Sequence, residues 1–253
     1  GSNQMEFHLP LKHMFGFCGI DKIMTNMRVS IVLTRNSHAN MIFQDNAADN
    51  GNKVSINRVR LYVPTVTPSI QAISQIEGKL NAGFTQRLEW LKVNCYKSPL
   101  FQAGDTTPQW RISNSSVKPR HVFIAIQKQS QDQNEEENNQ IFSTQNVTEV
   151  FMRVNSEQIP REKIETDYNA ASKSTTRAYS LFQKYKNRFG DSDSGSLVNN
   201  VDFSSGLYNI YYFDLTRIEP TAFHTSGQAD LEVRMRRTGN DAMVMYAVVC
   251  SEA

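Results

Sequence analysis

The chain has 253 residues, 39% hydrophobic and 21% charged, a mixture that can bury a core and excludes a wholly disordered polypeptide. Its 27 basic and 25 acidic residues nearly cancel, which excludes a dedicated polybasic binder of nucleic acid or membranes. No apolar run is long enough to span a membrane and no leader pattern opens the chain, so we expect neither a membrane segment nor a signal peptide. Gly1 and Ser2 read as a cloning scar, and we expect residues 1–4 to be a scar or leader outside the fold. The three cysteines, Cys18, Cys95 and Cys250, are too few and too widely spaced for a disulfide framework, which fits a reducing compartment.

Alternating apolar and polar residues, typical of strands with one buried face, extend over most of the chain. The first such runs are Met27 to Leu33 and Val54 to Val63. The second run changes phase near Asn57, which predicts a β-bulge because one extra residue reverses the side-chain register. A similar shift is expected within 88–95. Further strands are expected at 122–126, 150–154, 208–215, 231–236 and 242–250, and the last should be a central strand because it is apolar on both faces.

Two segments have helical spacing instead. Thr67 and Pro68 predict an N-cap followed by proline at the first helical position, ahead of an apolar series: Ile70, Ile73, Ile76 and Leu80. A second helix should stop at Gly190 and carry one apolar stripe: Ala178, Leu181, Phe182, Tyr185 and Phe189.

Two polar stretches should be exposed loops. Gln127 to Gln140 has almost no apolar content and predicts a mobile loop between two strands. Gly190 to Gly206 is rich in Ser, Asp, Asn and Gly. About ten strands, two short helices and long connecting loops indicate an all-β, antiparallel sandwich.

The residues that could carry chemistry do not assemble into a catalytic pattern. His8, His13 and Cys18 are the nearest approach to a metal site, but their spacing of five is awkward on a strand. There is no nucleophile elbow, P-loop or dinucleotide fingerprint. Glu135 to Glu137 lack the spaced ligands and glycine of a calcium loop. We therefore predict no catalytic residue, no cofactor and no metal, and a protein that is not an enzyme.

A basic run leaves two interpretations open. Arg234, Arg236 and Arg237 could form a nucleic-acid patch together with the basic end of the second helix, at Lys184, Lys186 and Arg188. Alternatively, Arg234 and Arg236 lie on a solvated strand face and are offset by Asp230 and Glu232, which the low net charge favours. We expect no specific nucleic-acid partner.

Several blocks of the chain, in the same order, resemble major capsid proteins of Polinton/Maverick-type transposable elements. The first runs from Phe7 to Thr34 and reads FHLPLKHMFGFCGIDKIMTNMRVSIVLT. The second, Ile56 to Ser69, reads INRVRLYVPTVTPS. The third, Trp110 to Gln127, is similar to paired strands that are closed by a K-P-R turn. The remaining blocks are an F-D-L-T segment followed by His224-Thr225-Ser226-Gly227, and a closing Y-A-V strand at Tyr246 to Val249.

The resemblance implies a double jelly-roll capsid protein whose subunits form homotrimers and tile a shell. On the family's order, residues 5–65 resemble the closing strands of a first jelly roll, and 66–253 resemble a complete jelly-roll domain. We therefore expect a jelly-roll sandwich with short helices and extra N-terminal strands, acting as a structural subunit that associates with itself. The alternative is a host-retained, capsid-derived or lectin-like binding module of the same fold, with its ligand groove near Phe203. The first interpretation implies location in a virion, the second in the cytoplasm or nucleus.

Overall fold

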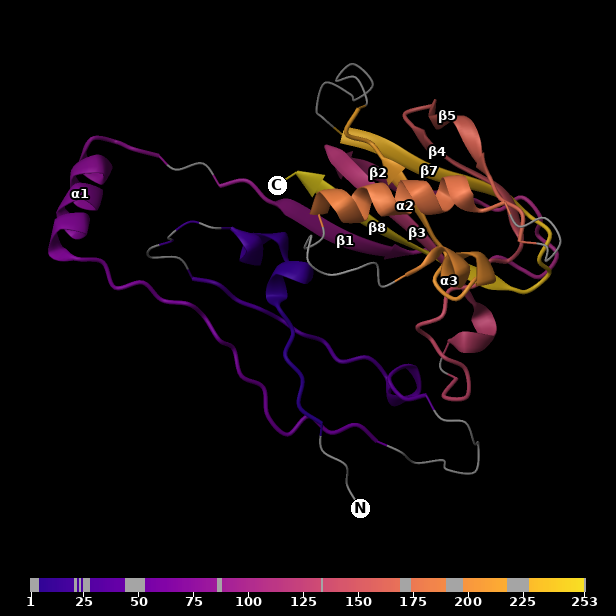
Figure 1. Cartoon of the computed structure of the whole chain (residues 1–253), viewed down its shortest axis with the longest axis horizontal. Coiled ribbons are helices and arrows are strands. Elements are labelled where there is room, and N and C mark those ends of the chain that lie inside the picture. Colours follow the sequence, from indigo (N-terminus) through magenta and orange to yellow (C-terminus); the bar gives the residue numbers. More distant parts are fainter. Residues whose placement is uncertain are drawn as a thin grey trace.

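The computed structural model of the chain describes residues 5–20, 22, 24, 28–43, 53–85, 88–132, 134–168, 174–189, 198–217 and 228–252. Within these residues two antiparallel, four-stranded sheets pack face to face (Figure 1). The first sheet has the strand order β1-β8-β3-β6 and contains β1 (Leu91–Lys97), β3 (Pro119–Lys128), β6 (Ile210–Asp214) and β8 (Met243–Glu252). The second has the order β2-β7-β4-β5 and contains β2 (Gln109–Val117), β4 (Val147–Val154), β5 (Glu157–Glu165) and β7 (Gln228–Arg237).

This topology is a jelly roll, because most strands that follow one another in sequence lie in opposite sheets. The all-β sandwich prediction is therefore confirmed, with eight strands in the described residues where about ten were expected. The prediction that β2 and β3 pair with each other was wrong. β2 pairs with β7, whereas β3 pairs with β6 and β8, and the chain crosses between sheets at Lys118, where φ is 40°.

The core lies between the sheets and follows the alternation of the strands. β8 lies between β1 and β3 and is apolar on both faces, as expected for a central strand. On β7, Leu231 and Val233 are fully buried while the residues between them face outward. β5 was not predicted, because its sequence EQIPREKIE is polar and contains Pro160, features of an edge strand.

Three α-helices accompany the roll. α1 (Ile70–Asn81) begins after Ser69, whose side chain caps the helix by accepting a hydrogen bond from the Ala72 amide. The predicted cap at Thr67 was therefore two residues early. α2 (Thr176–Phe189) matches the predicted second helix and packs along β6 and β5. α3 (Asn200–Ser205) lies within the stretch expected to be a loop, and is capped by Asn199 and ended by Gly206 in the left-handed conformation.

The described residues that precede β1 form an N-terminal arm (residues 5–90), which extends away from the roll (Figure 1). It contains the short 3-10 turns Leu11–His13, Gly16–Gly19 and His38–Asn40 besides α1. The extra strands expected at 28–33 and 54–63 are not formed in the part of the chain described, because no neighbouring strand lies against these extended segments. The bulge expected near Asn57 consequently has no ladder in which to occur.

Candidate functional site

The residues singled out as possible metal ligands do not converge. Cys18 and His8 are exposed on the arm, and the side chain of His13 lies outside the described part. No group of three or more His, Cys, Asp or Glu side chains that could hold a metal ion occurs among the described residues. No helix in the described part of the chain is long and apolar enough to cross a membrane.

The nearest approach to a reactive pair is His121 with Cys250, which the sequence analysis missed. They are cross-strand neighbours on β3 and β8, both almost completely buried. The Nδ1 atom of His121 lies 2.8 Å from the hydroxyl oxygen of Tyr212, and Tyr185 of α2 lies over the imidazole ring. Burial raises the pKa of the Cys250 thiol to about 11, so the sulfur remains protonated and unreactive at neutral pH. His121 and Cys250 therefore serve to pack the sheet beneath α2, and the protonated thiol does not act as a nucleophile.

The outer face of the second sheet carries the basic run considered above. Arg111 forms an ion pair of 2.7 Å with Asp230, and Arg234 forms one of 2.9 Å with Glu232. Arg236 is more open and lies 3.8 Å from Glu149. The interpretation of a solvated face with offset charges is therefore supported, since the acidic neighbours accept the basic groups.

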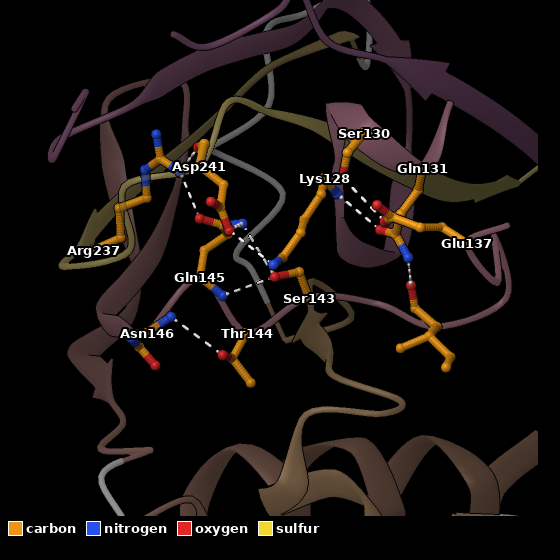
Figure 2. A network of polar contacts seen from close by, with 11 residues as sticks. Lys128, Ser130, Gln131, Glu137, Ser143, Thr144, Gln145, Asn146, Arg237 and Asp241 are labelled. Atoms are coloured by element: carbon orange, nitrogen blue, oxygen red, sulfur yellow. Dashed lines mark hydrogen bonds and ion pairs between the residues drawn. The ribbon is translucent and has the colours of Figure 1, made fainter. Parts of the chain in front are cut away.

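Arg237 does not belong to that face. It continues the inward phase of Val233 and Met235 and is 1% exposed. Its guanidinium donates to the carbonyls of Gln102, Asp105 and Asp241 at 3.1, 2.6 and 2.7 Å, and to the Gln145 side chain at 2.9 Å. Figure 2 shows Arg237 beside Gln145 and Asp241, and Lys128 binds Asp241 at 2.9 Å. One buried cation thus joins three loops at one end of the roll: β1–β2, β3–β4 and β7–β8.

The β3–β4 loop differs from the expected exposed, mobile loop. Gln131 is buried and its amide donates to the carbonyls of Asn138 and Ile141 at 3.0 and 3.1 Å. Its side-chain oxygen accepts from the Lys128 amide at 3.0 Å (Figure 2). The polar residues therefore satisfy the loop's own backbone, and their polarity does not imply solvation.

Phe203, the suggested aromatic of a lectin groove, was wrongly placed. It is fully buried in the core, where its ring lies near Tyr179 and Phe182 of α2. A buried ring cannot stack on a sugar.

Two open surface hollows, of about 430 and 500 Å³, occur beside Arg236 and beside Phe43. Several polar groups lining them, among them Glu149, Glu137 and Ser143, already bind neighbouring protein groups.

The N-terminal arm is the part of the described structure that exposes the most large hydrophobic side chains. Of the 26 large hydrophobic side chains that are exposed among the described residues, 21 lie between Met5 and Phe84. No residue of the arm belongs to the core cluster as described. Such a concentration of exposed apolar groups is typical of surfaces that bind another protein.

The arm is nevertheless held to the roll at two places. Gly16 lies so close to β1 that an added Cβ would be 2.1 Å from the Leu91 carbonyl oxygen. Beside it, the rings of Phe17 and Trp90 meet edge to face, with their centroids 5.5 Å apart. Farther along, the Asn40 side chain exchanges hydrogen bonds with the β3–β4 loop, accepting from Asn139 at 3.1 Å.

Comparison with known proteins agrees with the topology. A search of curated proteins finds no match. A family model described as the double jelly roll-like domain matches residues 1–234, which include the arm, the first six strands and most of β7. This match covers most of the chain, and the roll that it spans has jelly-roll connectivity. The chain belongs to the double jelly roll-like domain family.

Proposed function

We propose that this protein is a structural subunit of capsid type, which associates with itself through surfaces around the jelly roll and performs no catalysis. The observation that carries the proposal is the distribution of apolar surface. The roll buries its own core, whereas the arm exposes most of the large hydrophobic side chains that remain outside it. Large apolar groups in water are stabilised when another surface covers them.

The arm also suggests the kind of surface that it meets. In the segment 54–63 the residues Val59, Leu61 and Val63 alternate with polar or amphipathic ones, and all are exposed. Extended backbone that lies outside a β-ladder favours pairing with a strand edge. We propose that residues 5–65 are the closing strands of a first jelly roll, and that they pair with strands from a neighbouring subunit or from outside this segment.

Membership of the double jelly roll-like family supports a capsid-type role. Within that role we propose a homotrimer, a Polinton/Maverick-type origin for the gene, and incorporation into a virion. A host-retained module of the same fold would keep the sandwich and lose the shell, so it differs in its assembly behaviour.

The test is the mass of the protein in solution, by light scattering after size-exclusion chromatography, with electron microscopy of the peak. The chain has a mass of 28.8 kDa, and we expect a species of three times that mass, or larger cages. Leu61→Asp should shift the population toward monomer because it places a charge on the apolar face. Arg60→Asp, which places the same charge at the neighbouring exposed position on the opposite phase, is the control and should leave the mass unchanged. A strict monomer at all concentrations would contradict the proposal.

A further inference from the structure

Helix α1 has an apolar side that is exposed. α1 has an apolar stripe formed by Ile70, Ile73, Ile76 and Leu80, which lie within one third of the helix circumference. All four are exposed, from 38% for Ile76 to 86% for Ile70. A helix of 12 residues with a glycine, here Gly78, is marginal in water on its own, so its stability favours a partner.

The same chain carries part of a sheet without a helix to cover it. The outer face of the first sheet is divided into two halves. Over β3 and β6, Tyr185 of α2 packs on Phe123 and Tyr212, with ring centroids 4.4 and 5.4 Å apart. Over β1 and β8, Val93 is 43% exposed and Cys95 is exposed beside Val248. We name the outward side chains of this second half the β1–β8 strip: Val93, Cys95, Tyr246 and Val248.

The two surfaces match in length. The stripe from Ile70 to Leu80 is about 15 Å long at the rise of an α-helix. The outward face of β1 from Val93 to Lys97, which holds the β1 residues of the strip, is about 13 Å long at the rise of a strand. Lys97, at the end of this face, already pairs with Asp132 at 3.1 Å and lies over the Tyr246 ring at 5.6 Å, so its charge is offset and does not oppose an apolar helix.

We infer that α1 of one copy covers the β1–β8 strip of a second copy. This inference rests on the proposed self-association and names one of its contacts. The position of α1 favours a second copy over its own roll, because the arm carries α1 out to the far end of the molecule, away from its own β1 (Figure 1). The way that α2 covers the other half of this sheet shows that the sheet accepts a helix on its outer face.

Native Cys95 makes the contact testable by crosslinking. Cys18, the other exposed cysteine, is first replaced by serine, and Cys250 is buried. In this background, Ile76→Cys places a thiol in the middle of the stripe, whereas Gln71→Cys places one on the opposite side of α1. After mild oxidation of the full chain, we expect severalfold more interchain disulfide for Ile76→Cys than for Gln71→Cys, and loss of the product when Cys95→Ser is added.

Mixing tagged and untagged chains before oxidation identifies the crosslink as interchain. An intrachain disulfide would overturn the inference, since α1 would then cover its own roll. Equal crosslinking of the two variants, or none in a preparation whose mass shows oligomers, would also overturn it while leaving the proposed function intact. A preparation that contains only monomers contradicts both the proposed function and this contact.

Discussion

Replacing Arg237 should destabilise the roll more than replacing any exposed arginine. The guanidinium is 1% exposed and makes four hydrogen bonds, three of them to loop carbonyls. In Arg237→Ala these acceptors lose a charged donor and remain in a site that solvent cannot easily reach. Each hydrogen bond to a charged group contributes about 1.5–3 kcal/mol, and such contributions are not additive. Against them stands the cost of burying a cation, which lowers the pKa of Arg237 and which the nearby carboxylates of Asp105 and Asp241 offset only in part.

The net loss should be about 3–5 kcal/mol, which corresponds to roughly 10 °C in the melting midpoint for a domain of this size. Arg236→Ala is the matched control, on the same strand and one residue away. Its side chain is 67% exposed and its ion pair with Glu149 is 3.8 Å long, so it should cost less than about 1 kcal/mol. Thermal unfolding followed by circular dichroism measures both variants. Equal shifts in the two midpoints would refute the idea that Arg237 joins the three loops.

Three further predictions follow from close contacts and burial. Gly16→Ala should release the start of the arm from β1, because the new Cβ would collide with the Leu91 carbonyl oxygen. Trp90, which packs on Phe17 beside this contact, should then emit at longer wavelength. Gly19→Ala is the control and should leave the emission unchanged, because its nearest neighbour atom is 3.8 Å away. Phe203→Ala should cost about 3–5 kcal/mol in urea unfolding, whereas an exposed groove aromatic would cost little. Alkylation of the native protein near pH 8.5, read by mass spectrometry, should modify two thiols and spare Cys250, whose pKa of about 11 keeps it protonated at a pH where a free thiol is partly ionised. Rapid modification of all three would contradict that burial.

Period-two alternation was sufficient to predict the roll's interior strands. The runs at 122–126, 150–154 and 231–236 all became strands with the expected buried phase, because a sheet with one dry face imposes this pattern. β5 escaped because an edge strand can be polar and can contain proline. Which strands pair could not be predicted from alternation, since the pattern fixes the face of a strand and leaves its neighbours open.

The site residues were predictable in part. Arg237 has the same phase as Val233 and Met235, so the alternation already predicts an inward side chain. It was grouped with Arg234 and Arg236 because of its charge alone. The burial of Gln131 could not be foreseen, because its partners are backbone carbonyls of the same loop, and their position depends on the loop's path. Phe203 was misplaced because its polar neighbours suggested a loop, whereas Asn199 caps a short helix that turns the ring into the core.

In the described residues, the roll and the arm differ in how far their side chains are already bound by protein groups. At the loop end of the roll, described polar side chains are bound to one another or to backbone, as Lys128 is to Asp241 and Gln131 to its own loop. Such a network holds loops in fixed positions, which benefits a surface that must match another copy. The free energy still to be gained lies in the arm, where apolar side chains such as Val59 and Leu61 remain in water. Association with another surface therefore has a driving force in this chain, and the anchors at Gly16 and Asn40 fix where on the roll that force acts.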